Sequence, residues 1–152
     1  MIARLKKLLS ASTTDTLKVG VDEKKIAIAA LLIEAALSDE TYCDDERAMV
    51  SDVLKRYFDL SDEDVAAVVT EAEAAHAKAT QILHFTRTVK ETVEFDERVE
   101  IIEMLWEIAY ADNVISDYEA NLVRRVCGLI YVDDKESGNA RKRVLAKLKI
   151  AE

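Results

Sequence analysis

Residues 34–46 read EAALSDETYCDDE, and residues 107–119 read EIAYADNVISDYE. Both segments fit the pattern E-x-A-x-x-D-x-x-x-x-D-x-E, and the alignment that places Glu34 on Glu107 gives eight identities among the twenty-two positions 32–53. Chance alone would give about one or two identities over such a length. The sequence therefore predicts one helix–loop–helix unit that occurs twice, because a repeat of this length corresponds to a supersecondary unit.

The composition favours helices over strands. The chain has 152 residues, of which 50% are hydrophobic and 34% charged, with no proline and only three glycines. Without proline, long uninterrupted helices are favoured, and so few glycines leave no Gly-rich phosphate-binding loop. The predicted fold class is all-α, a single-domain bundle of seven to eight helices built from two pseudo-symmetric repeats, about residues 22–80 and 95–150.

Apolar periodicity places the expected helices within this plan. They cover residues 23–38, 44–57, 61–79, 96–111, 116–130 and a last helix after 133, with a connecting segment at 81–93. In the first of them, Glu34 is the only polar side chain between residues 26 and 37, so that helix should be buried on most sides. The expected N-caps are Asp22, Ser61, Asp96, Ser116 and Asp133.

The charge is unevenly distributed along the chain. The net charge is -9, while residues 1–10 carry +3 and residues 140–152 carry +4, which leaves -16 for the residues between them. Such an acidic middle would repel nucleic acid. Residues 1–16 form a basic segment and a linker, and residues 17–152 form the helical domain. The basic amphipathic residues 1–10 are expected to pack on the body or to contact an anionic membrane surface.

Two further features indicate a cytoplasmic protein. No apolar run reaches the length of a membrane span, and residues 1–12 lack the apolar core of a signal peptide. Cys43 and Cys127 form no C-x-x-C pair and cannot make a disulfide framework.

Both acidic segments carry an aspartate where the helix dipole disfavours a negative charge. Asp39 and Asp112 are expected at the C-terminal ends of helices, where the helix dipole disfavours an anion by about 0.3–1 kcal/mol. A divalent cation held by oxygen ligands would remove that penalty. If the two segments face each other across a pseudo-two-fold axis, one metal site can draw on six carboxylates: Glu34, Asp39, Glu46, Glu107, Asp112 and Glu119. Calcium, magnesium or manganese would suit such ligands, and no organic cofactor is expected.

Three of these six carboxylates also have a simple interpretation without a metal. Glu46 and Glu119 fit the acidic position of a capping box. Glu107 continues a stripe with Glu100 and Glu103, so solvent exposure alone would explain it. Glu34 and the two aspartates lack a comparably simple explanation.

The spacing of the two segments resembles that of the TerB-like tellurite-resistance family, whose all-helical, duplicated members carry an Asp followed by a Glu about seven residues later. The matching residues are Asp39 with Glu46 and Asp112 with Glu119, within a resemblance that covers about residues 22–148. The chain departs from the family where Glu40 and Asn113 replace the usual glycine. The resemblance implies a cytoplasmic, stress-associated protein, an acidic surface that binds divalent metal, no established catalysis, and a role of related domains as interaction modules.

Catalytic alternatives find less support. A carboxylate di-metal enzyme of the ferritin-like kind needs E-x-x-H on two helices, and only Glu73 with His76 fits. We interpret His76 as a surface residue of an alanine-rich helix, and neither cysteine has an identifiable base. The prediction is a non-enzymatic domain with a metal site. The alternative is a protein-interaction module without a metal, and the sequence fixes neither the partner nor the oligomeric state.

Overall fold

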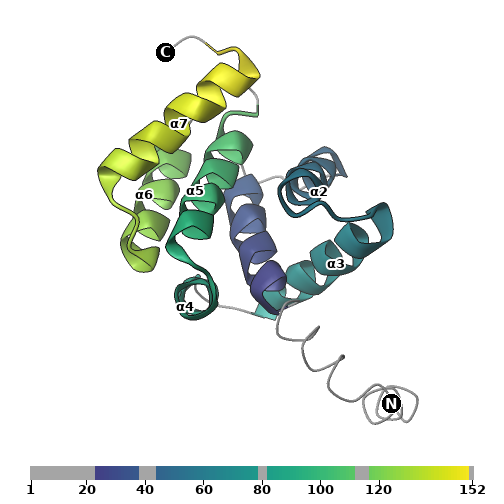
Figure 1. Ribbon diagram of the computed structural model, residues 1–152. Coiled ribbons are helices and arrows are strands. Elements are labelled where there is room, and N and C mark those ends of the chain that lie inside the picture. The colour runs from purple at the N-terminus through teal and green to yellow at the C-terminus, as the bar shows by residue number, and fades with distance from the viewer. Residues whose placement is uncertain (1–22, 38–43, 79–81, 112–116, 151–152) are drawn as a thin grey trace, which may run out of the picture.

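The computed structural model describes residues 23–37, 44–78, 82–111 and 117–150. These residues form seven helices and no strand, which confirms the all-α prediction. The first helix spans residues 23–36 and is followed by α2 (Asp44–Phe58), α3 (Asp62–Lys78), α4 (Leu83–Thr92), α5 (Phe95–Ala109), α6 (Asp117–Ile130) and α7 (Asp134–Leu148) (Figure 1). The predicted basic helix at residues 1–10 lies outside the described residues. Within the described ranges, no helix is both long and apolar enough to cross a membrane.

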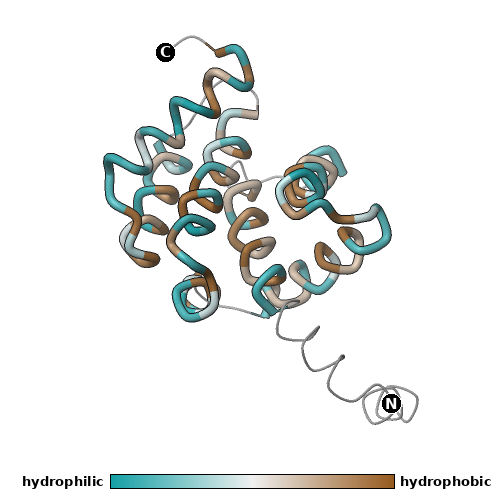
Figure 2. Tube along the Cα trace, viewed as in Figure 1, coloured by the Kyte–Doolittle hydropathy of each residue, from teal (hydrophilic) through white to brown (hydrophobic). Residues whose placement is uncertain are grey.

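The 23–36 helix and α5 form the centre of the core. In the 23–36 helix residues 27–33, 35 and 36 are all buried, as the sequence predicts. In α5 the same holds for Ile101, Ile102 and every residue from Met104 to Ala109. Figure 2 shows the 23–36 helix as mainly apolar, whereas α5 and the outer helices alternate between apolar and polar stretches. Each fully buried leucine or isoleucine contributes roughly 1.5–3 kcal/mol.

The order of the helices follows the sequence repeat. Helix α6 begins at Asp117, which the repeat aligns with Asp44 at the start of α2. After these helices the alignment shifts by a single position, and Tyr131 then corresponds to Asp59. Both residues adopt the left-handed conformation, with φ of 62° and 52°. We call residues 23–78 the first half and residues 95–150 the second half, with α4 between them. In the second half α5 packs against both α6 and α7, and α4 packs on α6.

Two of the predicted N-caps are confirmed. Ser61 Oγ accepts a hydrogen bond from Asp64 N at 3.1 Å, and Asp133 Oδ1 accepts one from Glu136 N at 2.8 Å. The prediction that Asp96 caps α5 is wrong, because α5 begins at Phe95 and its N-cap is Glu94, whose side chain makes no capping bond. Asp96 instead lies in the first turn, where the helix dipole favours an anion. Asp22 and Ser116 lie outside the described residues.

Arg98 joins the ends of two helices to α5. Its Nε donates to Val93 O at 2.9 Å, one terminal nitrogen donates to Lys90 O at 3.0 Å, and the other donates to Ile130 O at 3.3 Å. The last carbonyls of a helix have no partner within the helix, so this guanidinium satisfies groups at the ends of α4 and α6. The contact fixes the connecting helix α4 against the second half.

Substitution of two helical glycines should stabilise the protein. A Cβ placed at Gly128 in α6 or at Gly138 in α7 would meet no heavy atom within 4 Å. Because alanine loses less conformational freedom in a helix, Gly128→Ala and Gly138→Ala should each raise the free energy of unfolding by about 0.5–1 kcal/mol. Chemical denaturation of each variant measures this gain, and a loss of stability at either site would contradict the open surroundings described here.

Candidate functional site

The 23–36 helix and α5 lie side by side and run in the same direction (Figure 1). Near their first turns, Lys24 Nζ and Glu97 Oε2 are 2.7 Å apart, and these residues occupy equivalent positions of the sequence repeat. Near the other end, Glu34 of the 23–36 helix contacts Tyr118, in the first turn of α6. The chain therefore enters both acidic segments at the same end of the molecule.

Glu34 is held by side chains from both halves. Its Oε1 lies 2.8 Å from His76 Nε2 of α3, and its Oε2 accepts a hydrogen bond from Tyr118 OH at 3.2 Å. The Glu34 and His76 side chains are only 24% and 20% exposed, so the interpretation of His76 as a surface residue is wrong. Burial, together with the charge of Glu34, raises the pKa of Tyr118.

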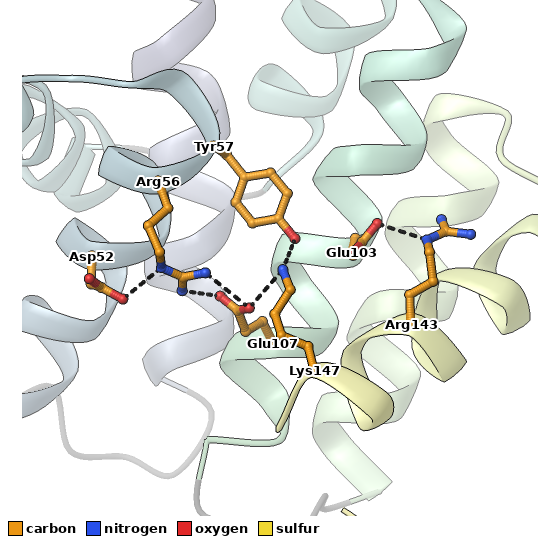
Figure 3. Close-up of polar contacts among 7 residues, drawn as sticks. All are labelled: Asp52, Arg56, Tyr57, Glu103, Glu107, Arg143 and Lys147. Carbon is orange, nitrogen blue, oxygen red and sulfur yellow. Dashed lines mark hydrogen bonds and ion pairs between the residues drawn. The ribbon is translucent and has the colours of Figure 1, made fainter. Parts of the chain in front are cut away.

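Glu107 is a buried carboxylate with two cationic partners (Figure 3). Arg56 of α2 donates to both of its oxygens, at 2.5 Å to Oε2 and 3.4 Å to Oε1, and Lys147 Nζ of α7 is 3.4 Å from Oε1. The Glu107 side chain is 5% exposed, so the interpretation of Glu107 as part of a solvated stripe is wrong. The hydrogen bond to Glu107 raises the pKa of Arg56 and keeps the guanidinium charged.

Further polar contacts extend from Glu107 over the surface between α2, α5 and α7 (Figure 3). Lys147 Nζ also donates to Tyr57 OH at 3.2 Å, and Arg56 Nε donates to Asp52 Oδ2 at 3.0 Å. Burial raises the pKa of Tyr57, so its hydroxyl stays protonated at neutral pH. The network thus fixes the orientation of α2 in the first half against α5 and α7 in the second.

Glu34 and Glu107 occupy equivalent positions and are contacted by equivalent elements. Each is met by the third helix of its own half and by the second helix of the other half. The chemistry differs, because Glu34 meets an imidazole and a phenol, whereas Glu107 meets a guanidinium and an ammonium. Each glutamate therefore has partners from other helices, two cations at Glu107 and an imidazole with a phenol at Glu34.

Of the four remaining predicted ligands, the structure describes Glu46 and Glu119. Glu46 and Glu119 are each the third residue of their helices, α2 and α6, and both are partly buried. Asp39 and Asp112 lie outside the described residues. Among the described residues, no three His, Cys, Asp or Glu side chains are grouped so that they could hold a metal. The described members of the predicted six-carboxylate set do not make up a metal site by themselves.

The two residues of the single E-x-x-H motif, Glu73 and His76, contact different partners. Arg47 Nε donates to Glu73 Oε2 at 2.9 Å, whereas His76 faces Glu34. Cys127 is buried, and burial raises its thiol pKa, which disfavours a thiolate nucleophile. Cys43 lies outside the described residues.

Sequence reasoning missed the partners of the two glutamates. Arg56 and Glu107 come from opposite halves of the chain, and His76 follows Glu34 only after the whole of α2 and most of α3. Lys147 belongs to a helix whose basic character is evident in the sequence, but no local pattern indicates which carboxylate it meets.

A protein-family model described as tellurite resistance protein TerB matches residues 25–142. The matched segment includes both acidic segments and extends from the 23–36 helix into α7. Comparison with curated proteins and with solved structures finds no match.

Proposed function

Since this chain belongs to the TerB family, we propose that it is a non-enzymatic, tellurite-resistance-associated protein of the cytoplasm that binds a divalent cation between its two acidic segments. The proposed ligands are Asp39 with Glu46 and Asp112 with Glu119. In the sequence these residues follow the 23–36 helix and α5, and the described parts of these two helices end on the same side of the molecule. Carboxylate oxygens are the ligands that calcium, magnesium and manganese prefer.

The placement of the two helix ends is the observation that carries this proposal. The contact of Lys24 with Glu97 aligns the starts of the central helices, and the contact of Glu34 with Tyr118 links the far end of one to the helix that follows the other. Asp39 and Asp112 come shortly after these helix ends in the sequence, where an anion is disfavoured by the helix dipole. A bound cation would offset that cost and the repulsion between the carboxylates.

The two central glutamates have different roles in this proposal. Both oxygens of Glu107 are bound by Arg56 and Lys147, so Glu107 acts as a positioning residue that fixes the end of α5. Each oxygen of Glu34 accepts or shares one hydrogen bond and keeps a lone pair. Glu34 can therefore serve as a further oxygen ligand of the cation without losing its contacts with His76 and Tyr118.

Calorimetric titration of the metal-stripped protein with calcium, magnesium, manganese and zinc tests the site. We expect at least one of these ions to bind, and we expect the double variant Asp39→Asn with Asp112→Asn to bind it at least about tenfold more weakly, a difference of about 1.4 kcal/mol.

The matched control is Glu71→Gln with Glu100→Gln, which removes two exposed carboxylates from α3 and α5 and should leave binding unchanged. Equal heats in the aspartate variant and the wild type would exclude the proposed ligands.

The second candidate is a protein-interaction module without a metal. It is favoured by four large apolar or aromatic side chains that are exposed on the described surface: Leu83, Phe95, Tyr118 and Tyr131. Absence of binding for all four ions would favour this candidate over the cation site.

A further inference from the structure

The end of α4 and the start of α5 present an exposed aromatic ring among acidic residues. Phe95 is 47% exposed, and Glu91, Glu94 and Asp96 are exposed as well. Residues 91–97 carry a charge of -4 and contain no lysine or arginine. We call residues 91–97 the junction surface. It lies at the end of the molecule where the 23–36 helix begins (Figure 1).

The cations near the junction surface are engaged by other groups. Lys90 Nζ lies over the ring of Tyr131, 5.0 Å from its centroid. The guanidinium of Arg98 donates to three backbone carbonyls, as described above. Lys24 pairs with Glu97, which is the least exposed carboxylate of the junction surface. These contacts leave the other three carboxylates to be matched by something else.

The three exposed carboxylates of the junction surface have no cation of their own. Among the described residues, no side chain pairs with or donates to Glu91, Glu94 or Asp96. Glu91 lies in the last turn of α4, where the helix dipole disfavours an anion. Glu94 makes no capping hydrogen bond with its side chain, although it occupies the N-cap position of α5. A positively charged partner would therefore improve the electrostatics of this surface.

Residues 1–10 of the chain have the complementary chemistry. They read MIARLKKLLS and carry a charge of +3. Their apolar residues recur at helical spacing, namely Ile2, Leu5, Leu8 and Leu9. Such a segment combines positive charges, which suit the carboxylates, with apolar side chains, which suit the exposed ring of Phe95.

The point at which the described chain begins brings these residues within reach. The description starts at Glu23, and the next residue, Lys24, has its Nζ 2.7 Å from Glu97 Oε2 of the junction surface. Residues 11–22 lie between and can span at most about 40 Å. A tether of this length gives an effective concentration of about 1 mM. A contact with a Kd of about 1 mM would therefore already be formed about half of the time.

From these observations we propose that residues 1–10 dock on the junction surface of the same molecule. Arg4, Lys6 and Lys7 meet the three exposed carboxylates, and the leucine side chains cover the ring of Phe95. Docking forms no covalent bond and is independent of the proposed cation site.

Cross-linking with a carbodiimide tests this contact, because the reagent joins a lysine amine to a carboxylate that touches it. The sample is an equal mixture of unlabelled and isotopically labelled full-length protein, analysed by mass spectrometry. We expect Lys6 or Lys7 to be joined to residues of the junction surface, in pairs of peptides with the same label. Pairs with mixed labels would assign the segment to a second copy and overturn the proposal. Absence of these cross-links would overturn it as well.

A charge swap tests whether the carboxylates hold the segment. Glu91→Lys with Glu94→Lys should lower the yield of cross-links to Asp96 by at least about fivefold, since two attractive pairs become repulsive. The variant should fold, because a lysine at the end of α4 suits the helix dipole and the Glu94 side chain makes no cap. Adding Lys6→Glu with Lys7→Glu should restore cross-links between the substituted positions. Failure of this rescue would overturn the proposed pairing.

The matched control places the same charge change elsewhere. Glu63→Lys with Glu71→Lys alters two exposed glutamates of α3 and should leave the cross-links between residues 1–10 and the junction surface unchanged. An equal loss of cross-links in this control would show that net charge alone governs the yield, and it would overturn the assigned surface.

Co-sedimentation with phosphatidylserine vesicles tests the competing occupant, an anionic membrane. At about 0.15 M salt we expect the wild type to remain in the supernatant, because its basic segment is held by the junction surface. Sedimentation that Lys6→Glu with Lys7→Glu abolishes, in a protein that shows no cross-links to the junction surface, would assign the segment to the membrane and overturn the proposal.

Discussion

Replacement of both Arg56 and Lys147 by methionine should lower the free energy of unfolding by about 3 kcal/mol. The reason is Glu107, whose side chain is 5% exposed and would lose both cations while remaining buried. Removal of the partners of a buried charge costs about 3–5 kcal/mol. We expect the lower value, because Arg56 and Lys147 are themselves 44% and 42% exposed and water can approach from their side.

The design includes a rescue and a control. In the background of Glu107→Leu, the same two methionine substitutions should cost less than about 1 kcal/mol, because no buried charge is left unpaired. Lys55→Met is the matched surface control, since its partner Asp62 is 88% exposed, and it should leave the free energy of unfolding nearly unchanged. Urea denaturation of all variants measures these differences. An equal loss with and without Glu107 would show that the cations act through packing and not through the carboxylate.

Truncation of either central leucine should have a comparably large effect. Leu32 and Leu105 occupy equivalent positions of the repeat, and both are fully buried. Leu→Ala in a packed core costs about 2–5 kcal/mol through lost burial and the remaining cavity. If the two costs add, the double variant should lose roughly 4–10 kcal/mol, a large part of the 5–15 kcal/mol by which domains of this kind are stable.

The matched control for the leucine variants is Leu83→Ala in α4, where the side chain is 40% exposed. It should change the free energy of unfolding by less than about 1 kcal/mol. Thermal and urea unfolding followed by circular dichroism measure all three. If only one of the two central substitutions proved costly, the two halves would not share one core.

The sequence predicts those parts of the fold that depend on local chemistry. The 23–36 helix is buried because its apolar residues occupy all its faces, and Glu34 is exceptional there in the structure as in the sequence. The caps Ser61 and Asp133 are predictable because capping needs only a short polar side chain just before the free amide groups of the first turn. Even here one boundary differs, since the extended backbone at Glu94 starts α5 slightly before the expected cap.

The candidate site could be predicted only in part. The repeat indicates that Glu34 and Glu107 are equivalent, but it carries no information on what they contact. In the sequence, Glu107 continues the helical spacing of Glu100 and Glu103, which predicts an exposed acidic stripe, and in the structure only Glu100 of the three is fully exposed. Its burial is caused by Arg56 and Lys147, which arrive from other helices, and such distant pairing leaves no periodic pattern in the chain.

The contact between Lys24 and Glu97 depends on the two halves being different in sequence. In a symmetric dimer of two identical half-length chains, a residue at this position would face its own copy, so that a lysine would meet a lysine. Opposite charges can meet at equivalent positions only when the two halves differ. This ion pair is therefore open to the single chain and closed to a homodimer of either half.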